Sequence, residues 1–438
     1  MRNILVLLSF SMLIYSQIKA QVPAPLPVKH SSVLILGGIA HLGDGRVLEN
    51  SAIGFKDGYL NLVQDQMKGR VAVTAYDTVI RLNGQHVYPG FILPNTTLGV
   101  TEIDALRQTR DFKDVGMFNP NLRTATSINM DSEVMYTVRS NGVLVSQATP
   151  RGGMVSGTSS IYQMNGWNWE DALLKTDDGV HVYWPSRFSA GGPWYHKKNY
   201  EMKENQDSLL NELESFFRDA LAYSGLADMP VNLRLEAMKG VFDGSQKLFV
   251  HANLAYDILR IILFKKEFEI PNLVIVGGYE AYKIPDQLRE SNIPIVLRRV
   301  HSLPLKTQDD IHLPYKLPAM LYEMGIPFCL DMSGDMEAMN GRNLPFLAGE
   351  AVGYGLPYEE AVKAITGSTA QILGIANRVG ILATGKEATL IISSGDALDM
   401  RTNDITMAWI KGQPLNLTNH QRELYEKYKK RYEGTNTE

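Results

Sequence analysis

The chain has 438 residues, of which 45% are hydrophobic and 21% are charged, so it holds enough apolar material for a large core. The net charge of −4 and the absence of a basic run exclude nucleic acid as an expected partner. The single cysteine, Cys329, excludes an internal disulfide, so packing must supply the stability.

The first 20 residues have the pattern of a cleavable secretory signal. Arg2 gives a positive start, residues 4–15 form an apolar run, and Ala20 stands at the expected cleavage site. This run is too short to span a bilayer comfortably, so we expect no stable membrane insertion, and an uncleaved anchor is the alternative. Residues 21–31 are rich in proline and typical of a linker. The mature protein is therefore expected to be secreted or periplasmic.

Both ends of the mature chain show the pattern of an antiparallel sheet. In residues 32–87, short apolar runs are separated by the turn sequences Gly43-Asp44-Gly45 and Asp57-Gly58. Residues 379–416 show the same alternation of apolar runs and turns. We therefore expect one small β-sandwich domain built from these two parts. Residues 417–438 are expected to form a C-terminal helical tail.

Residues 88–378 alternate between short buried strands and amphipathic helices. Strands are predicted at 91–93, 143–147, 181–184, 248–252, 273–276, 293–297 and 326–330, and helices at 209–223, 254–264, 285–290, 317–324 and 357–366. This alternation favours an α/β fold with a TIM-like (β/α)8 barrel over a doubly wound sheet. Residues 149–160 are rich in glycine and hydroxyl side chains and predict a loop, of a kind that can present backbone N–H groups to an anion.

Residues 88–98 carry a resemblance to a known family. Their sequence, Tyr-Pro-Gly-Phe-Ile-Leu-Pro-Asn-Thr-Thr-Leu, resembles the Pro-Gly-Phe-Ile-Asp-x-His-x-His signature that opens the catalytic barrel of the amidohydrolase superfamily. Residues 250–252, 276–283 and 380–390 resemble the family's fifth strand, sixth strand and closing element. The motifs follow the family's order over nearly all of the mature chain and are most similar to secreted, imidazolonepropionase-like members. The resemblance implies hydrolysis of C–N bonds in amides, cyclic imides or small peptides.

The resemblance also implies a metal site, whose positions can be compared one by one. Family members hold one or two divalent metals, usually zinc, that activate water, while a carboxylate on the last strand moves the proton. His251 matches the fifth-strand histidine. Asn95 and Thr97 stand in place of the two first-strand histidines, and Gly277 stands in place of the sixth-strand histidine. The catalytic carboxylate corresponds to Asp335, or to Asp331 in the other register.

Two hypotheses follow, because amide and hydroxyl oxygens are weak zinc ligands and glycine has no side chain. The first is a C–N hydrolase with one divalent metal, zinc, at a site rebuilt around His251. The second is a barrel without metal-dependent activity that binds a small amide, imide or peptide-like ligand. It could also be the non-catalytic partner of an active relative in an oligomer. His251 also fits the role of a core histidine. Four further residues could contribute to a rebuilt site, namely His181 on the predicted strand 181–184, Asp177 and Asp178 before it, and His301 after the seventh strand. Their spacing does not single them out, and solvated positions are expected for them.

Overall fold

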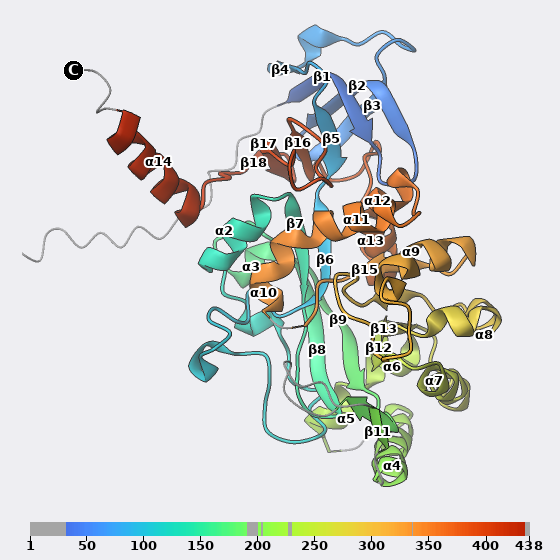
Figure 1. Cartoon of the computed structure of the whole chain (residues 1–438). Coiled ribbons are helices and arrows are strands. Elements are labelled where there is room, and N and C mark those ends of the chain that lie inside the picture. The colour runs from blue at the N-terminus through green and yellow to red at the C-terminus, as the bar shows by residue number, and fades with distance from the viewer. Residues whose placement is uncertain (1–31, 191–199, 203–204, 227–229, 335, 434–438) are drawn as a thin grey trace, which may run out of the picture.

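The structure, a computed structural model, describes residues 32–190, 200–202, 205–226, 230–334 and 336–433. The predicted signal sequence, the predicted linker and Asp335 therefore lie outside the described residues. A sheet built from both ends of the chain lies at one end of a larger barrel (Figure 1). In the part of the chain that is described, no helix is long and apolar enough to cross a membrane.

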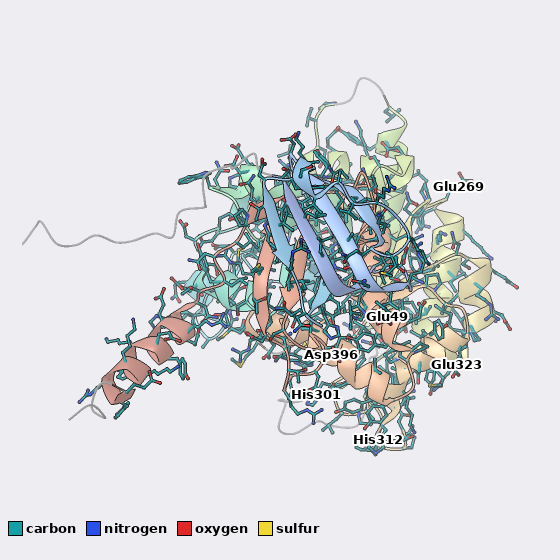
Figure 2. All side chains as sticks on the ribbon, turned by 90° about the horizontal axis from the view of Figure 1, so that it is seen from above. Glu49, Glu269, His301, His312, Glu323 and Asp396 are labelled. Carbon is teal, nitrogen blue, oxygen red and sulfur yellow. The ribbon has the colours of Figure 1, made fainter. Side chains whose placement is uncertain are left out.

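The terminal domain is one eight-stranded sheet to which both ends of the chain contribute. Its order is β18-β17-β16-β5-β1-β2-β3, and β4 also pairs with β1. The C-terminal strand β16 pairs antiparallel with β5, so distant parts of the chain lie side by side (Figure 2). The strands are β1 (Val33–His41), β2 (Val47–Lys56), β3 (Tyr59–Asp65), β4 (Thr78–Arg81), β5 (His86–Pro89), β16 (Leu390–Ser393), β17 (Ile405–Ile410) and β18 (Gln413–Pro414).

The second eight-stranded sheet curves into a nearly closed barrel, which confirms the predicted TIM-like fold. Its strands are β6 (Phe91–Thr96), β7 (Val143–Ala148), β8 (Val155–Gln163), β9 (Leu173–Tyr183), β12 (Lys247–Ala252), β13 (Leu273–Gly277), β14 (Ile295–Leu297) and β15 (Phe328–Leu330). Neighbouring strands are parallel, except that β8 runs antiparallel to both β7 and β9. The strands β6 and β15 form the two ends of the sheet. The N–H of Ile92 on β6 donates to the carbonyl of Ile365, which directly follows α12 (Tyr358–Ala364).

Strand β8 corrects one expectation from the sequence. Residues 149–160 were predicted to form a loop, but β8 begins at Val155 and all nine of its residues are buried. Its hydroxyl groups form hydrogen bonds with segments that the fold brings next to the strand. For example, Thr158 donates to the carbonyl of Pro120 at 2.8 Å, and Ser156 donates to that of His181 at 3.3 Å. A strand whose hydroxyls bond to nearby carbonyls can be buried in spite of its polar sequence.

The helices cover the outside of the barrel (Figure 1). They are α2 (Glu133–Arg139), α3 (Trp169–Ala172), α4 (Gln206–Ser224), α5 (Leu233–Glu236), α6 (Lys239–Asp243), α7 (Ala255–Glu267), α8 (Pro285–Glu290), α9 (Leu313–Glu323), α10 (Glu337–Asn340), α11 (Leu344–Gly353), α12 (Tyr358–Ala364) and α13 (Gly367–Leu373). A short hairpin of β10 (Phe188–Ala190) and β11 (Tyr200–Met202) follows β9. The tail forms α14 (His420–Glu433), which projects from the body and has no buried residue.

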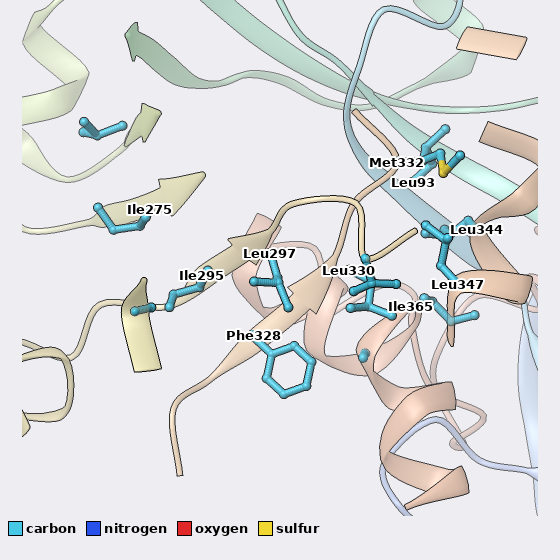
Figure 3. Packing of buried hydrophobic residues seen from close by; sticks show 14 of the residues in the cluster. Leu93, Ile275, Ile295, Leu297, Phe328, Leu330, Met332, Leu344, Leu347 and Ile365 are labelled. Carbon is cyan, nitrogen blue, oxygen red and sulfur yellow. The ribbon is translucent and has the colours of Figure 1, made fainter. Parts of the chain in front are cut away.

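The barrel strands separate two apolar layers, because successive side chains of a strand point to opposite faces. The outward residues pack under the helices; Figure 3 shows Ile275, Ile295, Leu297, Phe328 and Leu330 in this layer. The inward residues form a second cluster to which every barrel strand contributes, together with Ile372 and Leu373 from α13. Cys329 is fully buried in this inner cluster, and burial raises the pKa of its thiol, as expected for a core residue rather than a nucleophile.

Candidate functional site

A cavity of about 410 Å3 opens where the barrel strands end. It is lined by Asn95, Tyr183, His251, Asn253, Val276, Gly277, Arg298, Arg299, Ser333 and Gly334. These residues follow or end β6, β9, β12, β13, β14 and β15, so the cavity lies at the carboxyl end of the barrel, where barrel enzymes carry their active sites. The structure thus brings three of the predicted positions together, those of Asn95, His251 and Gly277.

Asn95 lies in an irregular end of β6, and both polar atoms of its side-chain amide form hydrogen bonds. The pairing of β6 with β7 shifts between Leu93 and Thr96, and Asn95 takes a positive φ of 48°, which asparagine tolerates better than most residues. Its Nδ2 donates to Oδ2 of Asp331 at 2.6 Å. Its Oδ1 accepts from Nη1 of Arg151 at 3.0 Å. The residue in place of the first histidine therefore links the first strand to the eighth through one donor and one acceptor of its side-chain amide.

Arg151, from the loop between β7 and β8, places a positive charge next to Asn95. Its Nη2 donates to the backbone carbonyl of Asn95 at 2.9 Å and forms an ion pair with Oε1 of Glu337 at 2.8 Å. Burial opposes the charge, but Tyr183, Glu337 and Asp331 lie close enough that the pKa of Arg151 stays raised. The same positive charge adds to burial in lowering the pKa of His251. The guanidinium therefore lies among residues of the first, fifth and eighth strands.

Asp331 is the eighth-strand carboxylate that the structure describes. It directly follows β15 and is 1% exposed. Burial raises its pKa to about 6, against the opposing effect of hydrogen bonds from Asn95 and Ser333. Thr97 is buried but does not line the cavity. Of the two alternatives for the catalytic carboxylate, Asp331 therefore contacts the site, and Asp335 lies outside the described residues.

His251 ends a chain of buried polar side chains. Its Nε2 lies 3.0 Å from Nδ1 of His181, whose Nε2 lies 2.9 Å from Oγ of Ser159. Ser159 in turn donates to Oδ1 of Asp178 at 2.7 Å, and Gln147 donates to Oδ2 of the same carboxylate at 2.8 Å. Gln147 also accepts the backbone N–H of Asn95 at 3.0 Å. One continuous network thus joins the fifth, fourth, third, second and first strands.

The donor directions in this network fix the histidine tautomers. Since Ser159 donates to Asp178, it accepts from Nε2–H of His181, and Nδ1 of His181 then accepts from Nε2–H of His251. Burial lowers the pKa of both histidines well below the usual value, so both are neutral at pH 7. His251 stacks on Tyr183 with a centroid distance of 4.1 Å, and its Nδ1 remains a hydrogen-bond acceptor.

The structure corrects the expectation of solvated positions for Asp178 and His181, which lie on β9 and are 0% exposed. Asp177 also lies on β9 and not before a strand, and it pairs with Arg123. His301 does lie on the surface, where it pairs with Glu350. Arg151, Glu337 and Asn253 were not recognised as site residues from the sequence. For Arg151 the sequence did offer an indication, because this residue lies in the segment 149–160 that is rich in glycine and hydroxyl side chains.

The residues present do not fit a catalytic zinc. Within the described ranges, no group of three or more His, Cys, Asp or Glu side chains could hold a metal. The Asn95 amide is engaged, and only one imidazole, that of His251, lines the cavity. A histidine could not simply be restored at Gly277, because its φ is 113° and a Cβ there would lie 2.7 Å from Oδ1 of Asn253. A catalytic zinc needs three protein ligands with an open position, and this set does not supply them.

Comparisons with known proteins agree on the fold. No protein-family model matches the chain. Its sequence is 24% identical over 188 residues to Amidohydrolase tasK from Hapsidospora irregularis, and the match covers 42% of this chain but only 19% of that protein. An amidohydrolase from Thermotoga maritima MSB8 has a similar structure, with a TM-score of 0.71 at 21% identity, covering 88% of this chain and 99% of that chain. A Xaa-Pro dipeptidase with methionine bound in its active site gives a TM-score of 0.53 at 15% identity, covering 88% and 100% of the two chains.

The barrel fold is therefore shared with a solved amidohydrolase. The resemblance to the amidohydrolase superfamily is confirmed by the shared barrel and by the partial sequence match. At these identities the structural similarity establishes the fold, and the reaction has to be argued from the residues of this chain.

Proposed function

We propose that this chain is an amidohydrolase-fold protein that has lost metal-dependent hydrolysis and binds a small amide or peptide-like ligand at its barrel mouth. The observation that carries the proposal is the position of Arg151. Its guanidinium bonds to Asn95 and Glu337 and interacts with Asp331 and His251, which are the groups that remain around the family's metal position. A fixed cation at this place repels a divalent metal and neutralises the carboxylates that would otherwise attract one.

The ligand class is supported by the size and lining of the cavity. Its volume of about 410 Å3 lies within the range of small-molecule sites. The lining offers amides, hydroxyls, an imidazole and guanidinium groups, which suit the polar groups of an amide or a short peptide. The names of the similar proteins, an amidohydrolase and a dipeptidase, point to the same chemical class.

Retained hydrolysis of C–N bonds is the second candidate function. It is favoured by the orientation of His251, whose Nδ1 stays an acceptor at the cavity while its Nε2 is held by His181. A neutral imidazole in this position can accept a proton from water. A single divalent metal such as zinc, if bound, would use the same Nδ1 as its imidazole ligand, and His251 would then hold the metal instead of accepting the proton.

We also propose that the protein is secreted or periplasmic after cleavage near Ala20. The support is the positive start and the apolar run of residues 1–20. A barrel that binds but does not hydrolyse could act as the non-catalytic member of an oligomer, and an active relative of the same fold is the partner we propose.

The test is the metal content of the purified mature protein, with and without prior incubation in excess zinc. We expect no metal above background in the wild-type protein. The variants are His251→Ala and, as the matched control, His301→Ala, whose side chain is 65% exposed and paired with Glu350. Stoichiometric zinc that is lost in H251A but kept in H301A would overturn the proposal in favour of a rebuilt metal site. Hydrolysis of amides and cyclic imides would then be assayed on the loaded protein.

A further inference from the structure

The C-terminal helix α14 is anchored at its start and exposed along the rest of its length. The segment before it is held by the body, because Leu417 is buried and Arg139 donates to the carbonyl of Asn416 at 2.6 Å. In the first turn, Gln421 accepts from Oγ1 of Thr137 at 3.2 Å. Beyond this turn the helix projects from the body (Figure 1), and none of its residues is buried. The anchored start therefore holds the rest of α14 away from the body.

One face of α14 is aromatic and apolar. Leu424 and Tyr428 are four residues apart, and Tyr425 and Tyr428 are three apart, so the three side chains lie on the same face of the helix. Leu424, Tyr425 and Tyr428 are 37%, 61% and 51% exposed, and Tyr432, one turn further on, is exposed as well. Exposed apolar and aromatic residues that share one face indicate a surface for an interaction.

Basic residues border this aromatic face on both sides. Lys427 and Arg431 lie three and seven residues after Leu424, along one edge of the face. Lys429 lies four residues after Tyr425, along the other edge, and its Nζ is 5.8 Å from the centroid of the Tyr425 ring. Positive charge therefore lies next to the rings on both edges.

The positive charge of the two edges is only partly neutralised by the protein. Within the described structure, the ion pairs of α14 join Lys429 to Glu433 at 3.7 Å and Arg422 to Asp404 at 3.6 Å. Exposed pairs of this length interact weakly. They leave the edge that carries Lys427 without an ion pair in that part of the chain.

The acidic residues of α14 lie away from the aromatic face. At 3.6 residues per turn, Glu423, Glu426 and Glu433 fall on the opposite side of the helix. The helix has five basic and three acidic residues, whereas the chain as a whole has a net charge of −4. An aromatic face with basic edges and an acidic back is complementary to an anionic surface.

A lipid surface matches this arrangement better than a second copy of the helix does. Pairing of two copies through Tyr425 and Tyr428 would bring their basic edges together, and like charges at such edges repel. Tyrosine has an apolar ring and a polar tip, which suits the boundary between headgroups and acyl chains, and lysine and arginine reach the lipid phosphates. With 14 residues, α14 is too short to span a bilayer, so it would lie on the surface.

We propose that α14 adsorbs to an anionic lipid surface, with its aromatic face at the level of the headgroups and its basic edges against the lipid phosphates. This peripheral contact lies outside the cavity at the barrel mouth and goes beyond the function proposed for that cavity. It holds the barrel close to a membrane through the C-terminal end of the chain.

The test is co-sedimentation of the purified mature protein with vesicles of phosphatidylcholine alone, and of phosphatidylcholine and phosphatidylglycerol in equal parts. At low salt we expect the partition coefficient to be about tenfold higher for the anionic vesicles, and to fall as salt screens the charges. The double variant Y425Q/Y428Q should lower it by about tenfold, because glutamine removes the rings but keeps a good helix propensity. Far-UV circular dichroism checks that the variant keeps its helix content.

Charge reversal at two lysines of the same helix supplies the matched control. Lys427→Glu places an acid at the edge of the aromatic face and should lower the partition coefficient on anionic vesicles by about fivefold. Lys430→Glu makes the same change of charge away from that face and should lower it by less than about twofold. No binding at low salt, equal binding to both kinds of vesicle, or equal effects of the two reversals would overturn the inference. Dimers in light scattering that Y425Q/Y428Q abolishes, without vesicle binding, would also overturn it and assign the face to a second copy.

Discussion

The two halves of the barrel interior are built from the same strands but differ in chemistry. On several strands, an apolar side chain in the lower half and a polar one in the upper half lie two positions apart in the sequence, so both point inward. These pairs are Val145 and Gln147 on β7, Ile161 and Ser159 on β8, Phe249 and His251 on β12, and Cys329 on β15 with Asp331 directly after it. On β8 the polar residue comes first, because this strand runs in the opposite direction.

The lower half is closed by α13 and filled with apolar side chains that stabilise the barrel, and Val276 is the residue of this cluster that also lines the cavity. The upper half buries a polar network, in which His181 stacks on Phe249 at 4.6 Å where the two halves meet. In this upper half, Arg151 provides a buried cation that bonds to Asn95 and Glu337. The comparison teaches that the fold and the chemistry of this barrel depend on different residues of the same strands.

Removing the cation of the upper half should have the largest effect on stability. Arg151→Met would leave the carboxylate of Glu337 and the carbonyl oxygens of Asn95 without their partner. We expect the free energy of unfolding, measured by urea denaturation, to fall by about 3–5 kcal/mol, as for other buried ion pairs that lose one member.

Two further variants make this result specific. The matched control Arg401→Met removes an exposed arginine and should leave the free energy of unfolding near that of the wild type. The double variant R151M/E337Q should recover part of the loss, because it also removes the unpaired carboxylate. A loss below about 1 kcal/mol in R151M alone would contradict the view that Arg151 holds the upper half together.

The buried carboxyl of Asp331 should give the upper half its own pH dependence. Its pKa is raised from 3.8 to about 6 by burial. Between these values the native state keeps a proton that the unfolded chain has released, so this residue's contribution to stability falls as the pH rises from about 4 to about 6. Asp331→Asn removes that dependence. From pH 4 to pH 7, the variant should therefore gain up to about 3 kcal/mol relative to wild type.

The control for this pH series is Asp399→Asn. Arg401 holds the pKa of Asp399 at about 2, so the contribution of this carboxylate is lost only at lower pH. Its curve of unfolding free energy should run parallel to that of the wild type between pH 4 and pH 7. If D331N also ran parallel to the wild type over this range, the carboxyl of Asp331 would be ionised throughout, and the upper half would be more polar than the hydrogen bonds indicate.

The sequence predicted the fold more completely than the site, and the reason is physical. The apolar inward and outward residues repeat along each strand, and this regularity can be recognised without knowing which strands are neighbours. Strand β8 was missed because its hydroxyl groups bond to carbonyls that only the fold brings near, such as that of Pro120. His251, Asn95 and Gly277 were placed through the resemblance. Arg151 could not be assigned in this way, since its partner Glu337 is 186 residues away in the chain.

The smallest effect should come from the lower half, and it tests whether the two halves are separable. Ile92 is fully buried in the inner apolar cluster on β6, three residues before Asn95. Ile92→Val removes one methyl group and should lower the free energy of unfolding by about 1 kcal/mol. The backbone bond of residue 92 to Ile365 does not involve the side chain, so the strand should keep its place. We therefore expect the fall in the free energy of unfolding between pH 4 and pH 7, which comes from Asp331 in the upper half, to be unchanged. If that pH dependence changed together with stability, the packing of the lower half would be positioning Asn95 and its neighbours, and the division of labour between the two halves would be wrong.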